Sequence, residues 1–180
     1  MILSDQEIMQ QIACGNIVIE PFHRESLGTN SYDVHLGKTL AVYDHDILDA
    51  KTRHAIKHFD IPSDGFVLLP NMLYLGVTEE YTETHRHVPF LEGKSSVGRL
   101  GIDIHATAGK GDIGFKNHWT LEISVKMPVR VYASMPVGQI IYFEVKGEVL
   151  MPYNLKQSAK YNEVSPRPQE SQMWRNFLPR

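Results

Sequence analysis

Cysteine, long apolar runs and excess charge are all scarce in this chain of 180 residues. Cys14 is the only cysteine, which excludes an internal disulfide bond and a zinc site built from several thiolates of one chain. No apolar run approaches the roughly 18 residues of a membrane span, and the first residues lack the basic and apolar regions of a signal peptide. We therefore expect a cytoplasmic protein that has no membrane partner.

The charge balance argues against a nucleic acid partner. The formal net charge is −3, so the chain lacks the basic excess of DNA-binding and RNA-binding domains. A phosphorylated small molecule would therefore need a local cluster of hydrogen-bond donors. Hydrophobic residues make up 42% of the chain and charged residues 22%, as in ordinary globular proteins, and the length predicts one domain over residues 1–180.

Short runs of alternating or β-branched residues dominate the chain after an N-terminal helix. Ser4 is a suitable N-cap, Glu7 stands where a capping box requires it, and Gly15 provides a stop. Many short strands with few helices predict an all-β-dominated fold, either a barrel or a sandwich. The strands are expected at residues 17–19, 32–36, 66–69, 73–77, 102–105, 119–125, 129–132 and 139–143.

Residues 93–101 combine positive charge, hydroxyls and glycine in the order Gly-Lys-Ser-Ser-Val-Gly-Arg-Leu-Gly. Arg99 can bind two phosphate oxygens at once, and Lys94 adds a compact charge. If a helical turn begins near Ser95, its free N–H groups also face an anion. The spacing differs from that of the Walker A loop. Taken alone, a solvated turn is the more frequent explanation of such a pattern.

Two carboxylates stand in informative places. Asp112 lies in a glycine-rich loop and could accept a hydrogen bond from a sugar hydroxyl, although turn aspartates are common. Glu122 alternates with the apolar Leu121 and Ile123, and shares a strand face with Thr120. A solvent-facing glutamate on a half-buried strand would give the same pattern, so both interpretations stay open.

The nine histidines do not form a recognisable metal motif. His85 and His87 could share a strand face, but no third ligand can be named from the sequence. The zinc deaminase signature, which needs a Pro-Cys-x-x-Cys segment, is missing. We therefore expect surface histidines and no metal bound directly by the protein.

Taken together, these segments resemble the dCTP deaminase family of the dUTPase-like superfamily. The resemblance is carried by Lys94-Ser-Ser-x-x-Arg99-Leu-Gly, His105-x-Thr-Ala, Asp112-x-Gly-Phe and Thr120-Leu-Glu122, in this order. It extends to the segment 30–37, to Gly138-Gln139 and to Tyr153-Asn154. It implies a distorted β-barrel of the dUTPase-like type, assembled as a homotrimer with active sites shared between subunits. The implied reaction is metal-independent hydrolysis of dCTP to dUTP and ammonia.

The resemblance also implies a role for each matching residue. Glu122 would be the catalytic carboxylate, with Ser95 and Arg99 near the reacting base and the carbonyl of Ala108 facing the base or the attacking water. Asp112 would bind the 3′-hydroxyl. A C-terminal segment, residues 152–180, would close over the nucleotide, and Mg²⁺ would arrive with the triphosphate. The remaining expected substrate contacts are Lys94, Ser96, Val97, Gly98, Thr120, Leu121, Gln139, Tyr153 and Lys160.

Several features set this chain apart from the family pattern and leave the outcome of the reaction open. A glutamine usually follows the Lys-Tyr pair of the closing segment, whereas residues 162–164 are Asn-Glu-Val here, and Gln169 lies too far along to be assigned by position. Gly109 and Gln139 look more like those of bifunctional members, which cleave the product on to dUMP. The pattern is also compatible with a dUTPase or a non-enzymatic nucleotide sensor, and dTTP is a candidate inhibitor.

Overall fold

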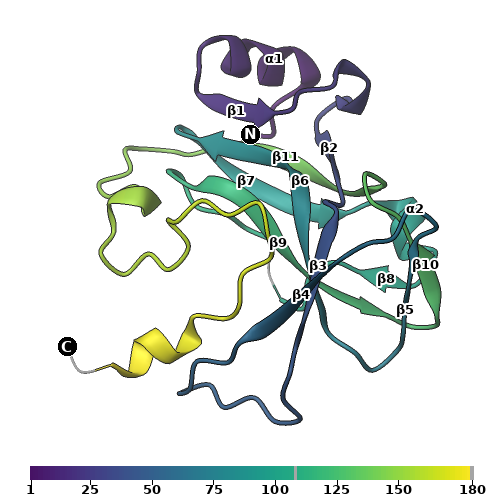
Figure 1. The fold of residues 1–180 in the computed structure, drawn as a ribbon. Helices are drawn as coiled ribbons and strands as arrows, with labels where there is room; N and C mark the ends of the chain where they lie inside the picture. The colour runs from purple at the N-terminus through teal and green to yellow at the C-terminus, as the bar shows by residue number, and fades with distance from the viewer. Residues whose placement is uncertain (108, 179–180) are drawn as a thin grey trace.

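The structure is a computed structural model that describes residues 1–107 and 109–178. It is built mainly of strands, with one helix of nine residues, α1 (Asp5–Ala13), near the N-terminus (Figure 1). Four shorter helical turns are η1 (Arg24–Ser26), α2 (Ser95–Gly98), η2 (Tyr153–Leu155) and η3 (Met173–Phe177). The strands are β1 (Ile17–Glu20), β2 (Tyr32–His35), β3 (Thr39–Tyr43), β4 (Ile56–Asp60), β5 (Phe66–Leu68), β6 (Tyr74–Thr84), β7 (His87–Gly93), β8 (Ile102–Asp103), β9 (Lys116–Val125), β10 (Val129–Val131) and β11 (Pro136–Glu144).

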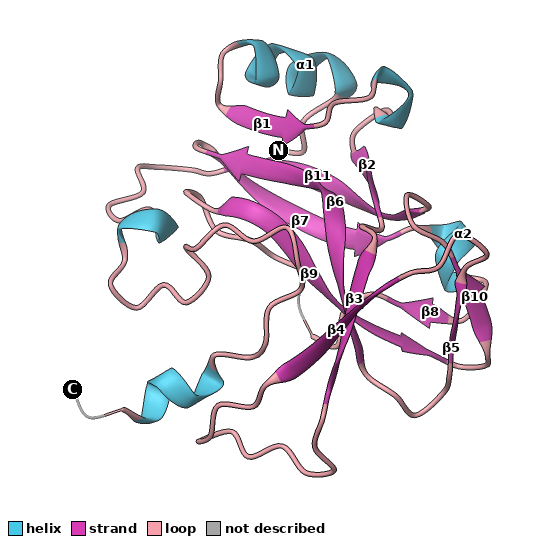
Figure 2. Ribbon diagram, viewed as in Figure 1, coloured by secondary structure: helices cyan, strands magenta, loops and turns pink. Residues whose placement is uncertain are grey.

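The strands form three antiparallel sheets that do not close into one continuous barrel. The largest has the order β4-β3-β6-β9-β8, with β1 also paired to β6. The other two are β2-β11-β7 and β10-β5. Figure 2 shows these sheets lying around a shared interior, with the helical elements at the periphery. The expected all-β-dominated fold with a short N-terminal helix is confirmed.

Helix α1 begins and ends as its sequence predicts. The Ser4 hydroxyl accepts a hydrogen bond from the backbone N–H of Glu7 at 3.3 Å, which satisfies one of the free donors of the first turn. At the other end Gly15 has a φ of +72°, a left-handed conformation that glycine adopts without a steric penalty. Ile8 is completely buried and attaches the helix to the core.

Strands β3, β4 and β7 have no counterpart among the strands that the sequence predicts. Strand β7 contains Pro89, and proline normally argues against a strand because it cannot donate to the ladder. Strand β4 is a largely exposed edge strand, without a buried face to create alternation. The strand expected at 102–105 extends only over Ile102–Asp103.

Strand β9 connects the core to the surface that carries the candidate site. Its residues alternate between buried and partly exposed along the whole strand, so Trp119, Leu121 and Ile123 enter the core. Thr120 and Glu122 therefore share the opposite face, as the sequence predicts. Within the described residues, none of the helices has both the length and the apolar character needed to cross a membrane.

Candidate active site

Glu122 is paired with a histidine on the open face of β9. The strand holds it in register with Leu75 of β6, and its carboxylate Oε2 lies 3.3 Å from Nδ1 of His105. The side chain of Glu122 is 38% exposed, whereas that of His105 is 14% exposed. Nδ1 donates to the carboxylate in this arrangement, so the imidazole fixes the orientation of a carboxylate that solvent and ligands can still reach.

A cavity of ≈ 460 Å³ lies over this pair. Thr120 and Glu122 belong to its β9 wall, and Leu73 and Leu75 supply apolar surface. Gln169, from the C-terminal segment, also lines it. The cavity thus combines a few polar groups with apolar walls, which is the usual character of a small-molecule site.

A second cavity of ≈ 320 Å³ adjoins the first, because Phe115, Trp119 and Tyr161 line both. It collects three residues that the sequence predicts for substrate binding: Asp112, Tyr153 and Lys160. The carboxylate of Asp112 accepts a hydrogen bond from Nζ of Lys110 at 2.9 Å. The hydroxyl of Tyr153 accepts from the backbone N–H of Lys160 at 3.2 Å, which fixes the course of the segment beside the cavity.

The glycine-rich loop that carries Asp112 packs too closely for side chains. A Cβ on Gly111 would lie 2.5 Å from the ring of Trp119, and one on Gly114 would meet the Asn154 side chain at the same separation. Gly114 also has a φ of +89°. These positions therefore need glycine to bring Asp112 and the C-terminal segment together.

The C-terminal segment, residues 152–178 as described, is bound to the sheet by side chains that contact its backbone. Nδ2 of the buried Asn117 donates to the carbonyls of Tyr161 at 3.2 Å and Glu163 at 2.9 Å. Oδ1 of Asn117 accepts from the N–H of Ser165 at 2.9 Å. Figure 1 shows this yellow part of the chain running beside β9 and β3. The segment therefore folds against the sheet and does not fray from it.

The expected phosphate-binding residues form a separate group. Lys94 is the N-cap of α2, and its ammonium contacts the carboxylate of Asp33 on β2. Gln139 of β11 is in register with Asp33. Ser95, Ser96, Gly98 and Arg99 are exposed, but none of the residues 94–99 lines either cavity over β9. The described part of the chain thus carries two separate halves of the predicted site.

Some predicted contacts are limited by burial. Val97 is 4% exposed and Leu121 is fully buried, so their side chains are not open to a ligand in one chain. Ala108 lies outside the described residues. Sequence reasoning missed the partnership of His105 with Glu122, the role of Asn117 and the place of Gln169. Only Asn117 carried a signal in the sequence, because it is a polar residue at a buried position of an alternating strand.

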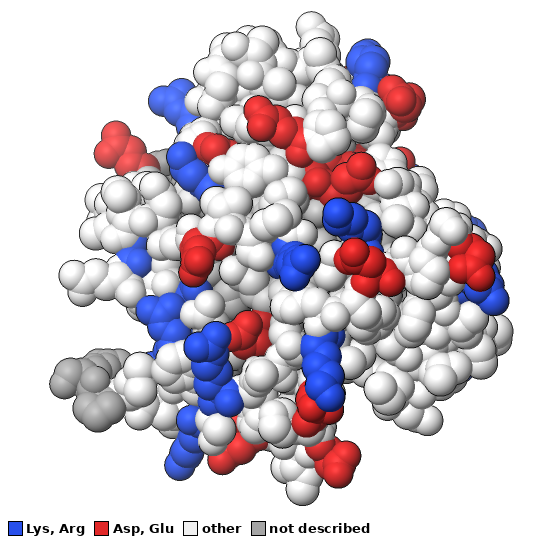
Figure 3. Space-filling model, in the orientation of Figure 1, with Lys and Arg blue, Asp and Glu red and all other residues white. Residues whose placement is uncertain are grey.

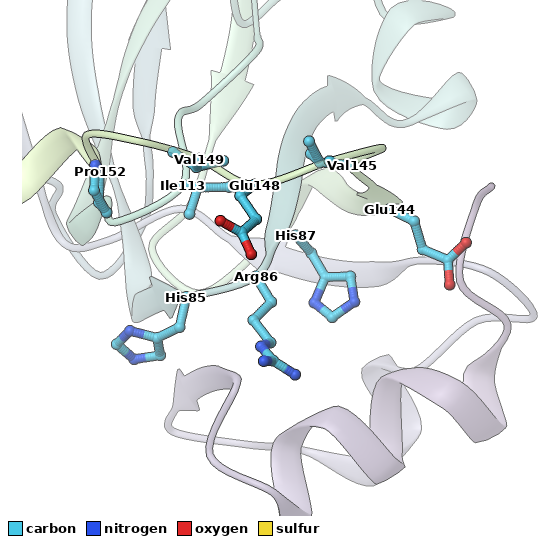
Figure 4. A pocket seen from close by; sticks show the side chains of 10 residues that line it. His85, Arg86, His87, Ile113, Glu144, Val145, Glu148, Val149 and Pro152 are labelled. Atoms are coloured by element: carbon cyan, nitrogen blue, oxygen red, sulfur yellow. The ribbon is translucent and has the colours of Figure 1, made fainter.

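A larger cavity of ≈ 690 Å³ has a different character (Figure 4). Basic side chains of His85, Arg86 and His87 and acidic side chains of Glu144 and Glu148 both line it. Burial lowers the pKa of His87, which favours its neutral form. Positive and negative groups are also interspersed on the face drawn in Figure 3. This cavity contains none of the described residues that the sequence predicts for catalysis, so the candidate site is the one over β9.

Comparisons with a family model and with known proteins point to the same family. The model of the family described as dCTP deaminase-like matches residues 2–145. The protein named "dCTP deaminase, dUMP-forming" of Clostridium beijerinckii is 48% identical over 177 residues, covering 98% of this chain and 99% of that protein. The protein of the same name from Clostridium acetobutylicum is 45% identical over 178 residues, with 99% of each chain covered.

A solved structure supports the fold. The 2′-deoxycytidine 5′-triphosphate deaminase of Agrobacterium tumefaciens superposes with a TM-score of 0.62 at 23% sequence identity. The match covers 78% of this chain and 47% of that one, so this chain corresponds to about half of the other. The likeness supports the expected β-dominated fold class.

Proposed function

This chain belongs to the dCTP deaminase-like family, and we propose that it converts dCTP and water to dUTP and ammonia. The observation that carries the proposal is the pair formed by Glu122 and His105 at 3.3 Å in a partly apolar cavity. The relatives named as dUMP-forming favour a second step, in which a second water hydrolyses dUTP to dUMP and diphosphate. We therefore propose the bifunctional reaction, acting on free nucleotides of the cytoplasm.

In the first step, Glu122 acts as the general base and then as the general acid. Its carboxylate removes a proton from water as the oxygen attacks C4 of cytosine, and this proton passes to N3. The remaining hydroxyl proton then moves through Glu122 to the amine, and ammonia leaves as C4 becomes a carbonyl. General acid–base catalysis of this kind is worth about 10²–10⁴-fold, so neighbouring groups must stabilise the developing charge.

His105 is a positioning residue in this scheme. Its Nδ1 holds one carboxylate oxygen of Glu122, which leaves the other oxygen for water and the pyrimidine. Ser95 and Arg99 would supply donors near the base, and Ala108 a carbonyl. Asp112 would accept a hydrogen bond from the 3′-hydroxyl, with Tyr153 and Lys160 closing over the nucleotide.

The separation of the two halves of the site leads us to propose a shared active site. The group around Glu122 and the group around Lys94 and Asp33 line different parts of the surface in one chain. In a cyclic homotrimer, residues 94–99 of one subunit can face the β9 cavity of the next. Each site then takes its proton shuttle from one subunit and its triphosphate ligands from another, and dTTP would compete for the same place.

Mg²⁺ would enter with the triphosphate, because phosphate oxygens and water are its preferred ligands. No three His, Cys, Asp or Glu side chains gather as metal ligands in the part of the chain that the structure describes. The carboxylate of Asp33, beside Lys94, has the chemistry to hold the ion or one of its waters. The ion would supply neutralisation of phosphate charge there.

One assay tests the reaction. The protein is incubated with dCTP and separately with dUTP, and ammonia and diphosphate are measured independently. Ammonia and diphosphate from dCTP are expected for the bifunctional enzyme. Ammonia alone would identify a deaminase that releases dUTP, and diphosphate from dUTP alone would identify a dUTPase. Nucleotide binding without either product would contradict the proposal and support a sensor.

A further inference from the structure

Gln169 lies in the cavity of Glu122, although it is 47 positions further along the chain. We infer that the side-chain oxygen of Gln169 recognises the exocyclic amine of cytosine and so selects dCTP over uracil and thymine nucleotides. This inference rests on the proposed deaminase function and adds a specificity-determining residue to it.

The backbone around Gln169 is fixed from both sides. Its N–H donates to the hydroxyl of Thr120 at 3.2 Å, on the same face of β9 as Glu122. The preceding Pro168 is buried, and its carbonyl accepts a hydrogen bond from Nε2 of His58 at 2.9 Å. The residue is thereby held beside the strand face that carries the proton shuttle, and its side chain needs no movement of the segment to reach the cavity.

The side-chain amide is oriented by a third contact. Nε2 of Gln169 donates to the carbonyl of Glu163 at 3.2 Å. A carbonyl can only accept, so the amide nitrogen must be on that side and Oε1 on the other. Within the described residues Oε1 has no hydrogen-bond partner, so it remains an acceptor for a ligand.

Neighbouring polar groups are already committed. The amide of Asn117 uses both its nitrogen and its oxygen on the C-terminal segment. Nδ1 of His118 donates to the carbonyl of Thr78 at 3.1 Å. Glu122 must change its protonation state during the reaction and cannot serve as a constant acceptor. Of the two amide side chains that line this cavity in the described part of the chain, Gln169 is thus the one with an oxygen available to bind a base.

The chemistry of the bases makes such an acceptor selective. Cytosine carries an amine at C4, which donates, whereas thymine and uracil carry an oxygen there, which accepts. Oε1 of Gln169 therefore favours the cytosine edge and opposes the uracil edge.

The test replaces Gln169 with methionine, which keeps the length of the side chain and removes the amide. The matched control is Gln157→Met in an exposed part of the same segment. For each protein, kcat/KM for dCTP is measured by ammonia release, and Ki is measured for added dUTP as a competitor of dCTP in the same assay. We expect Gln169→Met to lower kcat/KM for dCTP about tenfold, the scale of one lost hydrogen bond. The Ki for dUTP should not rise. The control should behave as wild type.

A purely structural role predicts a different result. If Gln169 only supports the segment through Glu163, Gln169→Met will lower kcat/KM for dCTP and raise the Ki for dUTP by the same factor. This result overturns the inference, and so does a variant whose two constants match those of wild type. Gln169→Glu keeps an acceptor and should retain the preference for dCTP, which protects the test against misfolding of the methionine variant. Wild-type protein that releases no ammonia would refute the proposed function itself.

Discussion

Two inactive variants should restore each other's activity if the active site is shared between subunits. Arg99→Ala removes a phosphate ligand from the exposed group beside α2, and Glu122→Gln removes the proton shuttle from β9. Glu122 lines the cavity over β9, whereas Arg99 lies at the end of α2, so the two residues belong to different halves of the proposed site. When both variants are co-expressed, a site between an Arg99→Ala subunit and a Glu122→Gln subunit can contain a native Glu122 and a native Arg99.

The size of the recovery follows from the assembly. In a cyclic trimer each active site takes one half from each of two neighbouring subunits. Random mixing of equal amounts of the two variants therefore gives four ordered pairs of subunits at a site. One of the four has both native residues, and we expect about a quarter of wild-type ammonia release. The assay uses co-expressed proteins with two different affinity tags, purified through both tags in succession, and the expected fraction is corrected for the loss of unmixed trimers.

A matched control separates complementation from contamination or partial folding. Asp112 and Glu122 line adjoining cavities of the same chain, so Asp112→Ala and Glu122→Gln damage the same half. Their mixture should remain inactive, because every site then carries one defect. Recovery in neither mixture would refute the shared site, and equal recovery in both would refute the division into these two halves.

Two further variants test the chemistry and the C-terminal segment. Glu122→Gln should still bind dCTP in a calorimetric titration but release ammonia about 10²–10⁴-fold more slowly; near-normal turnover would remove Glu122 from its assigned role. Asn117→Ala deprives three backbone groups of the segment of their partner, so limited proteolysis should cut within residues 152–178 much sooner than in wild type, and KM should rise. Unchanged protease resistance would show that other contacts suffice to hold the segment.

Local features of the fold were predictable because their causes are local. The cap at Ser4, the stop at Gly15 and the alternation along β9 all follow from residues within a few positions of one another. The same alternation put Thr120 and Glu122 on one face. Sequence reasoning failed where a strand lacked its usual signal, as in β7 with Pro89.

The candidate site was less predictable, because its parts meet through long-range contacts. The hydrogen bond between His105 and Glu122 joins residues 17 positions apart, and that between Gln169 and Thr120 spans 49 positions. A spacing pattern cannot contain such information. Motif resemblance predicted both groups of residues, but their separation within one chain became visible only in three dimensions.

The C-terminal segment shows why position along the chain was a poor guide to Gln169. Its main attachments use backbone groups: Asn117 binds the carbonyls of Tyr161 and Glu163, and Thr120 binds the N–H of Gln169. Backbone groups are the same for every residue type, so these attachments fix the path of the segment and leave its side chains free to differ. Gln169 can therefore reach the cavity of Glu122 although it stands eight positions beyond Tyr161.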